Sequence, residues 1–445
     1  MTIAALPELA ALDSSPDGVR IPPDVTAPLT PRVRSLLDTP EVRRLARVSQ
    51  LGLVALVYPG AVHARFEHSL GVYRLALEFL ARLRRDERFA ATVRESDAAA
   101  FVAAALLHDV GHWPYCHPLE DMGLPEIPRH ESLVGDLLGG GAPAAVLEAE
   151  WDVEPGRVAA LIAGTATDPA GRLLCSLLSG PIDIDKMDYL SRDSLHAGVP
   201  YGRHFDQARL LASLCVDERG SALAITDKGR TAAELMVFAR YVMFSEVYWH
   251  HAVRAATAML QRAVWILRDR LDVPWLVRSD DASFVHWITT AAAGTRAAPL
   301  VAGLFGPTRR LFKRAASYDA LHHPAVHRAV AGRPYAESAA LAGRLAENLT
   351  RRLGRPIATD DLLVDAPPAE REVEFRLQVR ERAPGLPGGS TWRRFEDLSP
   401  VVRSLAREQF DDLVKRVRIF AAPAVRDAVA CCPNLETAIL EAAAG

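Results

Sequence analysis

The chain has 445 residues, 49% of them hydrophobic, and a formal net charge of −3. This length and hydrophobic content suffice for a large buried core, and the length favours two or three structural units. The small negative charge excludes a chain-wide electrostatic footprint for nucleic acid, although a local basic pocket for phosphate stays open.

Three features of the sequence predict a reduced, cytoplasmic protein. No apolar run reaches the roughly 18 residues of a membrane-spanning helix. The first residues, MTIAALPELAALDSSPDGVR, lack a basic segment before an apolar stretch, so no signal peptide is expected. The five cysteines show no metal-type spacing, which favours free thiols over disulfides or a zinc site.

The first part of the chain predicts mostly helices. The first thirty residues are rich in Pro, Asp and Ser and are expected to form an extended arm or an irregular entry to the fold. Beyond them, helical spacing of apolar residues or nearly continuous apolar composition predicts helices at 40–51, 68–83, 98–108 and 171–178, and one long helical region at 231–271.

The second part predicts weaker helices and two strands. Helices are expected at 284–293, 335–353 and 395–414, and a strand is expected at 417–420. Residues 370–379 (EREVEFRLQV) alternate polar and apolar residues, which is typical of a strand. The predicted fold class is therefore mainly α, with a small C-terminal α/β lobe. We expect four segments: an N-terminal arm (1–37), a helical core (38–275), a helical extension (276–355) and the α/β lobe (356–445).

Histidines and carboxylates are concentrated in four short stretches. These are 60–71 (GAVHARFEHSLG), 107–120 (LHDVGHWPYCHPLE), 129–131 (RHE) and 182–193 (IDIDKMDYLSRD), and nearly half of the fourteen histidines lie between positions 63 and 130. An imidazole and a carboxylate buried on apolar helices cost several kcal/mol unless each has a partner. A divalent cation is a partner for both, and mixed nitrogen and oxygen ligands suit Fe, Mn, Zn or Ni.

His108 and Asp109 are adjacent in the sequence. Neighbouring side chains on a helix diverge by about 100 degrees, so both can reach one ion only near a helix end or in a crowded interior. Gly111 supplies such an end.

These motifs resemble the HD-domain phosphohydrolases, and they are most similar to the deoxynucleoside triphosphate triphosphohydrolase branch. The stretches HARFEHSLG, HDVGHWPYCH and IDIDKMDYLSRD, in this order, carry the resemblance, which extends from about Asp38 to Leu260. It implies an HD-domain helical core over 38–275. It also implies attack on the α-phosphorus of a deoxynucleoside triphosphate, with a deoxynucleoside and tripolyphosphate as the products.

The resemblance also implies a role for individual residues. The implied metal ligands are His68, His108, Asp109 and Asp185. The implied catalytic residues, with His117 as proton donor and Glu120 as the acidic residue that orients this machinery, are His112, His117, Glu120 and His130. The implied substrate-binding residues are Gln50, Leu51, Arg65, Lys186, Tyr189, Asp193 and Tyr248.

The implied cofactor is a divalent ion, with Mn, Fe, Mg, Ni and Zn all left open. The implied partners are the nucleotide substrate, a second copy of the chain in a dimer or tetramer, and a possible nucleotide activator; no membrane or nucleic-acid partner is indicated. Asp38 matches the family's guanine-nucleotide site, whereas Arg43 and Ala46 replace the Gln and Arg expected there.

Several of these residues also have purely structural interpretations. His112 and His117 could be surface histidines that follow the end of a helix. Arg65 could form an ion pair with Glu67 or Glu131. Tyr248 lies in an aromatic run that is as typical of a core as of a pocket. Asp183 and Asp188 are expected to cap a helix or to form ion pairs.

Two other functions remain open on the sequence. One is an HD-type hydrolase for another nucleotide, such as a nucleoside monophosphate, a cyclic dinucleotide or an alarmone. The other is a nucleotide-sensing or nucleic-acid-binding module whose metal site is structural. Tripolyphosphate as the product would distinguish the main hypothesis from the first alternative, and metal-dependent turnover would distinguish it from the second.

Overall fold

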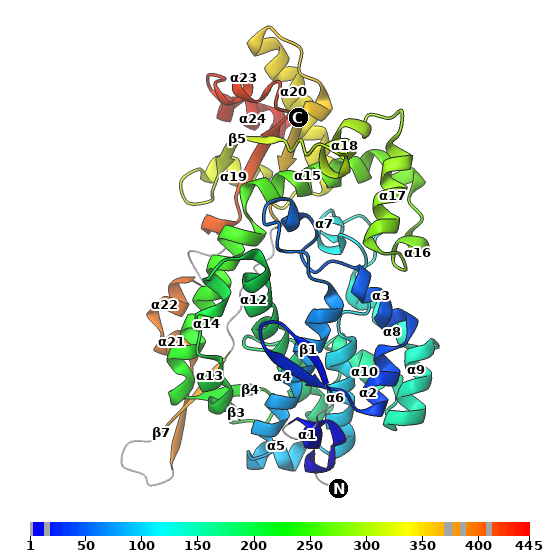
Figure 1. Cartoon of the computed structure of the whole chain (residues 1–445). Helices are drawn as coiled ribbons and strands as arrows, with labels where there is room; N and C mark the ends of the chain where they lie inside the picture. Colours follow the sequence, from blue (N-terminus) through cyan, green and yellow to red (C-terminus); the bar gives the residue numbers. More distant parts are fainter. Residues whose placement is uncertain (1–2, 13–17, 369–376, 383–388, 406–411) are drawn as a thin grey trace.

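The computed structural model describes residues 3–12, 18–368, 377–382, 389–405 and 412–445. The mainly α fold class is confirmed, with three small sheets among many helices (Figure 1). None of the helices in the described ranges combines the length and the hydropathy that a membrane span requires.

Four helices form the centre of the lower half of the molecule in Figure 1. α6 is buried along nearly its whole length, because residues 98–107 are all apolar and its neighbours cover every face. It packs between α4 and α10, and α12 packs on the other side of α4. The four helices are α4 (Arg65–Leu83), α6 (Glu95–Leu107), α10 (Pro155–Ile162) and α12 (Ile184–Ala197).

Close packing of α4 against α12 depends on a glycine. A side chain at Gly71 on α4 would overlap the carboxylate of Asp188 on α12. Glycine at this position therefore lets the two helices approach closely. Asp183 begins α12 as its N-cap, since its side chain accepts a hydrogen bond from the Lys186 backbone at 2.7 Å.

The described part of the N-terminal segment is ordered, so the expectation of an extended arm was wrong there. Leu6 and Leu9 are buried in the core, and Tyr73 on α4 donates a hydrogen bond to the Pro28 carbonyl at 3.1 Å. Apolar residues among the prolines bury against α4, which orders the segment. It contains α1 (Pro7–Ala11), strands β1 (Gly18–Ile21) and β2 (Val25–Pro28), and α2 (Pro31–Leu37).

Two predicted helices are shorter than expected. The helix predicted at 40–51 is α3 (Pro40–Arg44) with one further 3-10 turn, because Ser49 pairs in a β-bridge with Ala64. The region 231–271 is two helices, α14 (Arg230–Met243) and α15 (His251–Leu267), joined by a π-helical turn and a break at His250. The turn places Tyr248 and Trp249 beside the cavity described below.

Smaller helices complete this half of the molecule. They are α5 (Glu87–Thr92), α7 (Cys116–Glu120), α8 (His130–Leu138), α9 (Ala142–Val146), α11 (Pro169–Leu178) and α13 (Gln207–Ser213).

α15 lies across the middle of the molecule and joins two further packing units (Figure 1). One of its faces buries Met259 and Ala263 against Leu300 and Val301 of α18. The helices of this unit are α16 (Val273–Leu276), α17 (Asp281–Ala292) and α18 (Ala298–Phe305).

The upper unit in Figure 1 is an α/β lobe. Its antiparallel sheet has the order β5-β9-β6, and Asp365 at the end of β6 binds Arg254 of α15 at 2.6 Å. The predicted strand at 417–420 is β9, and the predicted helix at 335–353 is α20. The elements are β5 (Lys313–Tyr318), α19 (Pro324–Val330), α20 (Tyr335–Leu353), β6 (Leu362–Asp365), β9 (Val417–Ala421), α23 (Arg426–Ala430) and α24 (Leu435–Ala444).

The chain between β6 and β9 returns to the lower half. There β7 adds in parallel to β4, so a four-stranded sheet has the order β3-β4-β7-β8. The predicted strand at 370–379 lies mostly outside the described residues, and the strand begins at Gln378. The predicted helix at 395–414 is interrupted at Ser399. These elements are β3 (Leu214–Val216), β4 (Leu223–Thr226), β7 (Gln378–Arg382), β8 (Ser390–Arg394), α21 (Phe395–Leu398) and α22 (Pro400–Ser404).

The division into four segments stays a prediction, but the sheets cross its boundaries. β5 of the predicted helical extension pairs with β9 of the predicted lobe. β7 of that lobe pairs with β4 of the predicted core.

Candidate metal centre and active site

Three helices bring two histidines and an aspartate together. His68 lies in the first turn of α4, His108 at the end of α6 and Asp185 in the first turn of α12. The Nε2 atom of His68 is 3.0 Å from Asp185 Oδ1 and 3.2 Å from His108 Nε2. One candidate ligand atom from each residue lies within 4.8 Å of the others, so all three can reach a single ion.

Asp109 lies beside this group and joins it to its surroundings. Its Oδ1 is 3.4 Å from His108 Nε2 and 3.1 Å from His112 Nδ1, and its Oδ2 accepts a hydrogen bond from Arg65 at 3.0 Å. Arg65 therefore pairs with Asp109 in the structure, and not with Glu67 or Glu131. The four residues that the sequence predicts as metal ligands meet in one place.

Asp188 orients His68 from the other side. Its Oδ2 is 2.8 Å from His68 Nδ1, and both its oxygens accept hydrogen bonds from Arg192 at 2.7 Å. A carboxylate on one ring nitrogen holds the other nitrogen toward a metal. The sequence alone predicts only a structural role for Asp188, in a helix cap or an ion pair. Its spacing of three from Asp185 on one helix is the signal that relates it to the metal cluster.

The charges around His68 favour a cation. Burial acts to lower the pKa of His68, but hydrogen bonds to Asp185 and Asp188 outweigh it and raise that pKa to about 10. Burial acts to raise the pKa of Asp185, whereas its hydrogen bond to His68 contributes to lowering it to about 2. The two imidazoles are surrounded by ionised carboxylates, and a divalent ion can replace the proton on His68. The donor set therefore fits a divalent metal cofactor of the Fe, Mn, Zn or Ni type.

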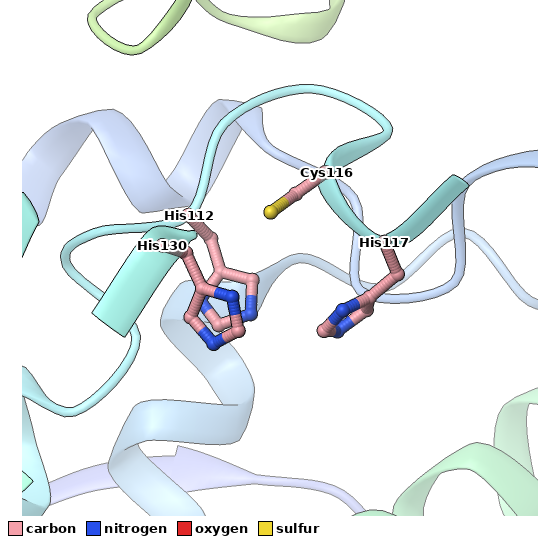
Figure 2. Close-up of side chains that lie close together, drawn as sticks. All are labelled: His112, Cys116, His117 and His130. Atoms are coloured by element: carbon pink, nitrogen blue, oxygen red, sulfur yellow. The ribbon is translucent and has the colours of Figure 1, made fainter. Parts of the chain in front are cut away.

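A second group of histidines lies next to the first. His112 follows α6, His117 lies on α7 and His130 begins α8; the His112 and His130 rings are 3.8 Å apart between centroids. A side chain at Gly111 would overlap the His130 carbonyl, so glycine there lets α8 approach this loop. Figure 2 shows the three imidazoles together, with the Cys116 thiol above them.

Glu120 holds two of these histidines in position. Its Oε1 is 3.0 Å from His130 Nδ1 and its Oε2 is 3.5 Å from His117 Nδ1. Burial acts to raise the pKa of Glu120, but the two histidines hold it below its ordinary value. Glu120 is therefore a carboxylate that orients both rings. His112 is buried and the His117 side chain is 58% exposed, so the surface-residue interpretation is wrong for His112 alone.

A cavity of about 400 Å³ opens beside the two groups. Seven residues named by the sequence analysis line it, and they come from the loop after α3, from α4, α7 and α12, and from the turn before α15. They are Gln50, Leu51, Arg65, His117, Tyr189, Asp193 and Tyr248.

Lys186 has a different environment from the other predicted substrate-binding residues. It is not among the residues that line this cavity, and its Nζ donates a hydrogen bond to Asp183 at 2.6 Å. Burial acts to lower the pKa of Lys186, but the Asp183 carboxylate outweighs it and raises that pKa.

Two side chains, those of Tyr248 and His63, hold the Asp193 carboxylate in position. Tyr248 donates its hydroxyl to Oδ2 at 2.7 Å, and the buried ring of His63 contacts Oδ1 through Nε2 at 2.8 Å. His63 was not predicted as a site residue. Its place two residues before Arg65 is the only signal for it in the sequence, because its contact with Asp193 spans 130 positions.

Comparisons with known proteins agree with this arrangement. The family described as HD domain matches residues 65–138, and the family described as HD associated region matches residues 205–435. A hypothetical protein from Aquifex aeolicus shares the fold, with a TM-score of 0.69 and 25% identity over 93% of this chain and 98% of its own. The fold and the His–Asp cluster define a helical protein of the HD type.

The chain belongs to the HD-domain superfamily of phosphohydrolases. It is 36% identical to the uncharacterised protein YwfO of Bacillus subtilis over 51% of this chain and 50% of the relative. It is 28% identical to the human deoxynucleoside triphosphate triphosphohydrolase SAMHD1 over 55% of this chain and 44% of the relative. The chain thus spans about half the length of the curated relatives that it matches.

Proposed function

We propose that this protein is a metal-dependent hydrolase that cleaves deoxynucleoside triphosphates into a deoxynucleoside and tripolyphosphate. One observation carries the proposal. One cavity is lined both by Arg65 and His117, which lie beside the metal cluster, and by Asp193 and Tyr248. The Tyr248 hydroxyl donates a hydrogen bond to the Asp193 carboxylate at the cavity wall. The cavity volume of about 400 Å³ falls in the range of small-ligand sites, roughly 300–1,000 Å³.

The metal cluster is the first part of the mechanism. His68, His108, Asp109 and Asp185 would hold the ion. When bound there, a divalent ion lowers the pKa of a coordinated water and polarises a phosphoryl oxygen. Asp188 keeps the His68 ring in the orientation that this binding needs, through the 2.8 Å contact with its Nδ1.

Arg65 is the residue that binds phosphate. It lines the cavity and uses Nη1 for the 3.0 Å hydrogen bond to Asp109, which leaves further donors of its planar guanidinium. A guanidinium can bind two phosphate oxygens at once. The bond to Asp109 therefore fixes Arg65 where the α-phosphate meets the metal cluster.

His117 is the proton donor in this proposal. Its side chain is 58% exposed and lines the cavity, and Glu120 lies 3.5 Å from its Nδ1. The Nε2 atom is then free to face the leaving 5′ oxygen of the deoxynucleoside, to which an imidazolium can donate. The buried His112 and the partly buried His130 complete the group, because they enclose His117 on the side away from solvent.

Asp193 and its neighbours bind the sugar. The 2.7 Å hydrogen bond from Tyr248 and the 2.8 Å contact with His63 hold the Asp193 carboxylate rigidly at the cavity wall. Remaining lone pairs on its oxygens can accept from a sugar hydroxyl. Gln50, with Leu51 and Tyr189, forms the neighbouring wall, and Gln50 Oε1 makes no hydrogen bond to any residue that the structure describes.

Product analysis tests the proposal. Purified protein is incubated with each of the four deoxynucleoside triphosphates and Mn or Mg, alone and with a mixture of the others as activators. We expect a deoxynucleoside and tripolyphosphate. Orthophosphate or pyrophosphate would instead support another HD-type hydrolysis, and no metal-dependent turnover would support the sensing module. The molecular mass of the protein in solution, measured with and without nucleotides, tests the predicted homo-oligomer. The turnover rate with and without the added nucleotides tests the predicted nucleotide activator.

A further inference from the structure

A thiol lies within the second group of histidines. His112, Cys116, His117 and His130 each offer one nitrogen or sulfur ligand atom, and these four atoms lie within 4.8 Å of one another (Figure 2). Cys116 was noted in the sequence only as an unpaired cysteine. None of the four belongs to the group formed by His68, His108 and Asp185. The chain therefore contains a second cluster of potential metal ligands, which we call the His–Cys cluster.

The ligand atoms of the His–Cys cluster suit zinc. Zinc binds Cys and His ligands tetrahedrally, with Zn–N distances of about 2.0–2.1 Å and Zn–S distances of about 2.3 Å, and three imidazoles with one thiolate supply four such donors. Such a site separates its donor atoms by about 3.4–3.7 Å, so the present separations need to shorten by roughly 1 Å at most. The thiol also favours a softer ion than a carboxylate does.

The rings are already oriented for such binding. Glu120 contacts Nδ1 of both His117 and His130, at 3.5 and 3.0 Å, which directs their Nε2 atoms elsewhere. This is the carboxylate–histidine–metal arrangement found around zinc ions. The Nε2 atom of His130 is 3.4 Å from Glu131, whose 44% exposed side chain is able to move into solvent.

His112 supplies a second, independent indication of a ligand. It is only 4% exposed, and its Nδ1 makes no hydrogen bond to any residue that the structure describes, although Asp109 lies 3.1 Å away. A buried imidazole nitrogen without a hydrogen bond is unfavourable unless a ligand meets it. The Cys116 side chain lies 2% exposed beside it, with its sulfur turned toward the rings (Figure 2).

We propose that His112, Cys116, His117 and His130 bind a zinc ion, and that zinc bound there inhibits hydrolysis. On binding, the Cys116 thiol loses its proton to solvent, one zinc–sulfur and three zinc–nitrogen bonds form, and the zinc ion releases coordinated water molecules to solvent. The inhibition rests on the proposed function, because zinc would occupy the His117 nitrogen that donates the proton to the leaving group. The binding site itself does not depend on that function.

Cobalt titration of the full chain tests the site without an activity assay. Co²⁺ is a spectroscopic substitute for zinc, and a cobalt–thiolate bond produces a charge-transfer band in the near ultraviolet. We expect this band in the wild-type protein, its disappearance on addition of Zn²⁺, and its loss in Cys116→Ser. Cys215→Ser is the matched control, since Cys215 is also a buried free cysteine but lies on β3 outside the His–Cys cluster. No band, or a band that persists in Cys116→Ser, would overturn the site.

X-ray absorption of the zinc-loaded wild-type chain is a check that needs no variant. A single sulfur neighbour at about 2.3 Å together with nitrogen neighbours at about 2.0–2.1 Å supports the site, and a shell of nitrogen and oxygen alone contradicts it.

Zinc titration of nucleotide hydrolysis tests the inhibition. Each protein is normalised to its own zinc-free rate, and Cys116→Ser should need about 10²-fold more zinc for half inhibition, because one of four ligands is lost. Equal sensitivity of both proteins would exclude inhibition through this site. If the protein shows the cobalt band but hydrolyses no nucleotide, the zinc site stands and the proposed function is wrong. If it hydrolyses nucleotide but shows no cobalt band, the proposed function stands and the zinc site is wrong.

Discussion

The two adjacent clusters differ in charge more than in position. In the first, two imidazoles meet Asp109 and Asp185, and Asp188 contacts His68 from behind. In the second, Glu120 contacts His117 and His130, which lie beside His112 and the Cys116 thiol. Asp109 connects the clusters, since it contacts both His108 and His112.

This difference separates two kinds of chemistry within one site. A cluster rich in carboxylates holds a divalent cation firmly and can polarise a phosphate. Imidazoles suit proton transfer near neutral pH, because the ordinary pKa of histidine is about 6.5. The Cys116 thiol adds a softer donor to the second cluster, which favours zinc.

The largest effect is expected for Asp109→Ala. It removes the residue shared by both clusters and leaves Arg65 without its 3.0 Å partner. Turnover should fall by about 10⁴-fold or more, because the stabilisation by the metal, worth several kcal/mol, is lost. Steady-state rates and metal content by atomic emission measure this. If the variant kept its turnover rate and its metal content, the first cluster would have no role in the mechanism.

His117→Ala breaks the second cluster alone. We expect kcat to fall by about 10²- to 10³-fold, the usual loss for a general acid, while metal content at the first cluster stays at the wild-type level. His204→Ala, a change at an exposed histidine, is the control. If the two variants had the same kcat, His117 would not be the proton donor.

Asp188→Asn sharpens the role of the carboxylate behind His68. The affinity for the metal should fall by about 10- to 100-fold, because the orientation of the imidazole is less well held. Isothermal titration with Mn²⁺ measures the dissociation constant. Asp206→Asn, at the exposed N-cap of α13, tests whether loss of any aspartate charge has this effect, and equal affinities for the two variants would contradict the proposed role.

Glu120→Gln tests the carboxylate of the second cluster through pH. The pKa of Glu120 in the folded chain lies below its ordinary value of 4.5, so ionised Glu120 stabilises the fold above that value and the contribution is lost as the pH falls. We expect the variant to be about 1–3 kcal/mol less stable near pH 7, with a difference that shrinks below about pH 4.5. Urea unfolding across pH measures the difference, and a constant difference would show that Glu120 acts without its charge.

Much of the fold was predictable because it follows from local spacing. The apolar run at 98–107 predicts α6, and the regular spacing at 335–353 predicts α20 without error. The break at His250 and the order in the N-terminal segment were not predictable. Each depends on contacts with distant residues, such as the hydrogen bond from Tyr73 to the Pro28 carbonyl.

Residue types and their spacing predict the chemistry that is available: the density of histidines, the neighbouring carboxylates and the HD-type motifs indicate the candidate ligands of one ion. Packing between segments, and not the local pattern, divides these residues into two clusters and places Cys116 beside three histidines. The physical reason is that α4 approaches α12 closely at Gly71 and α8 approaches the loop after α6 closely at Gly111, and local spacing along the chain does not specify either approach.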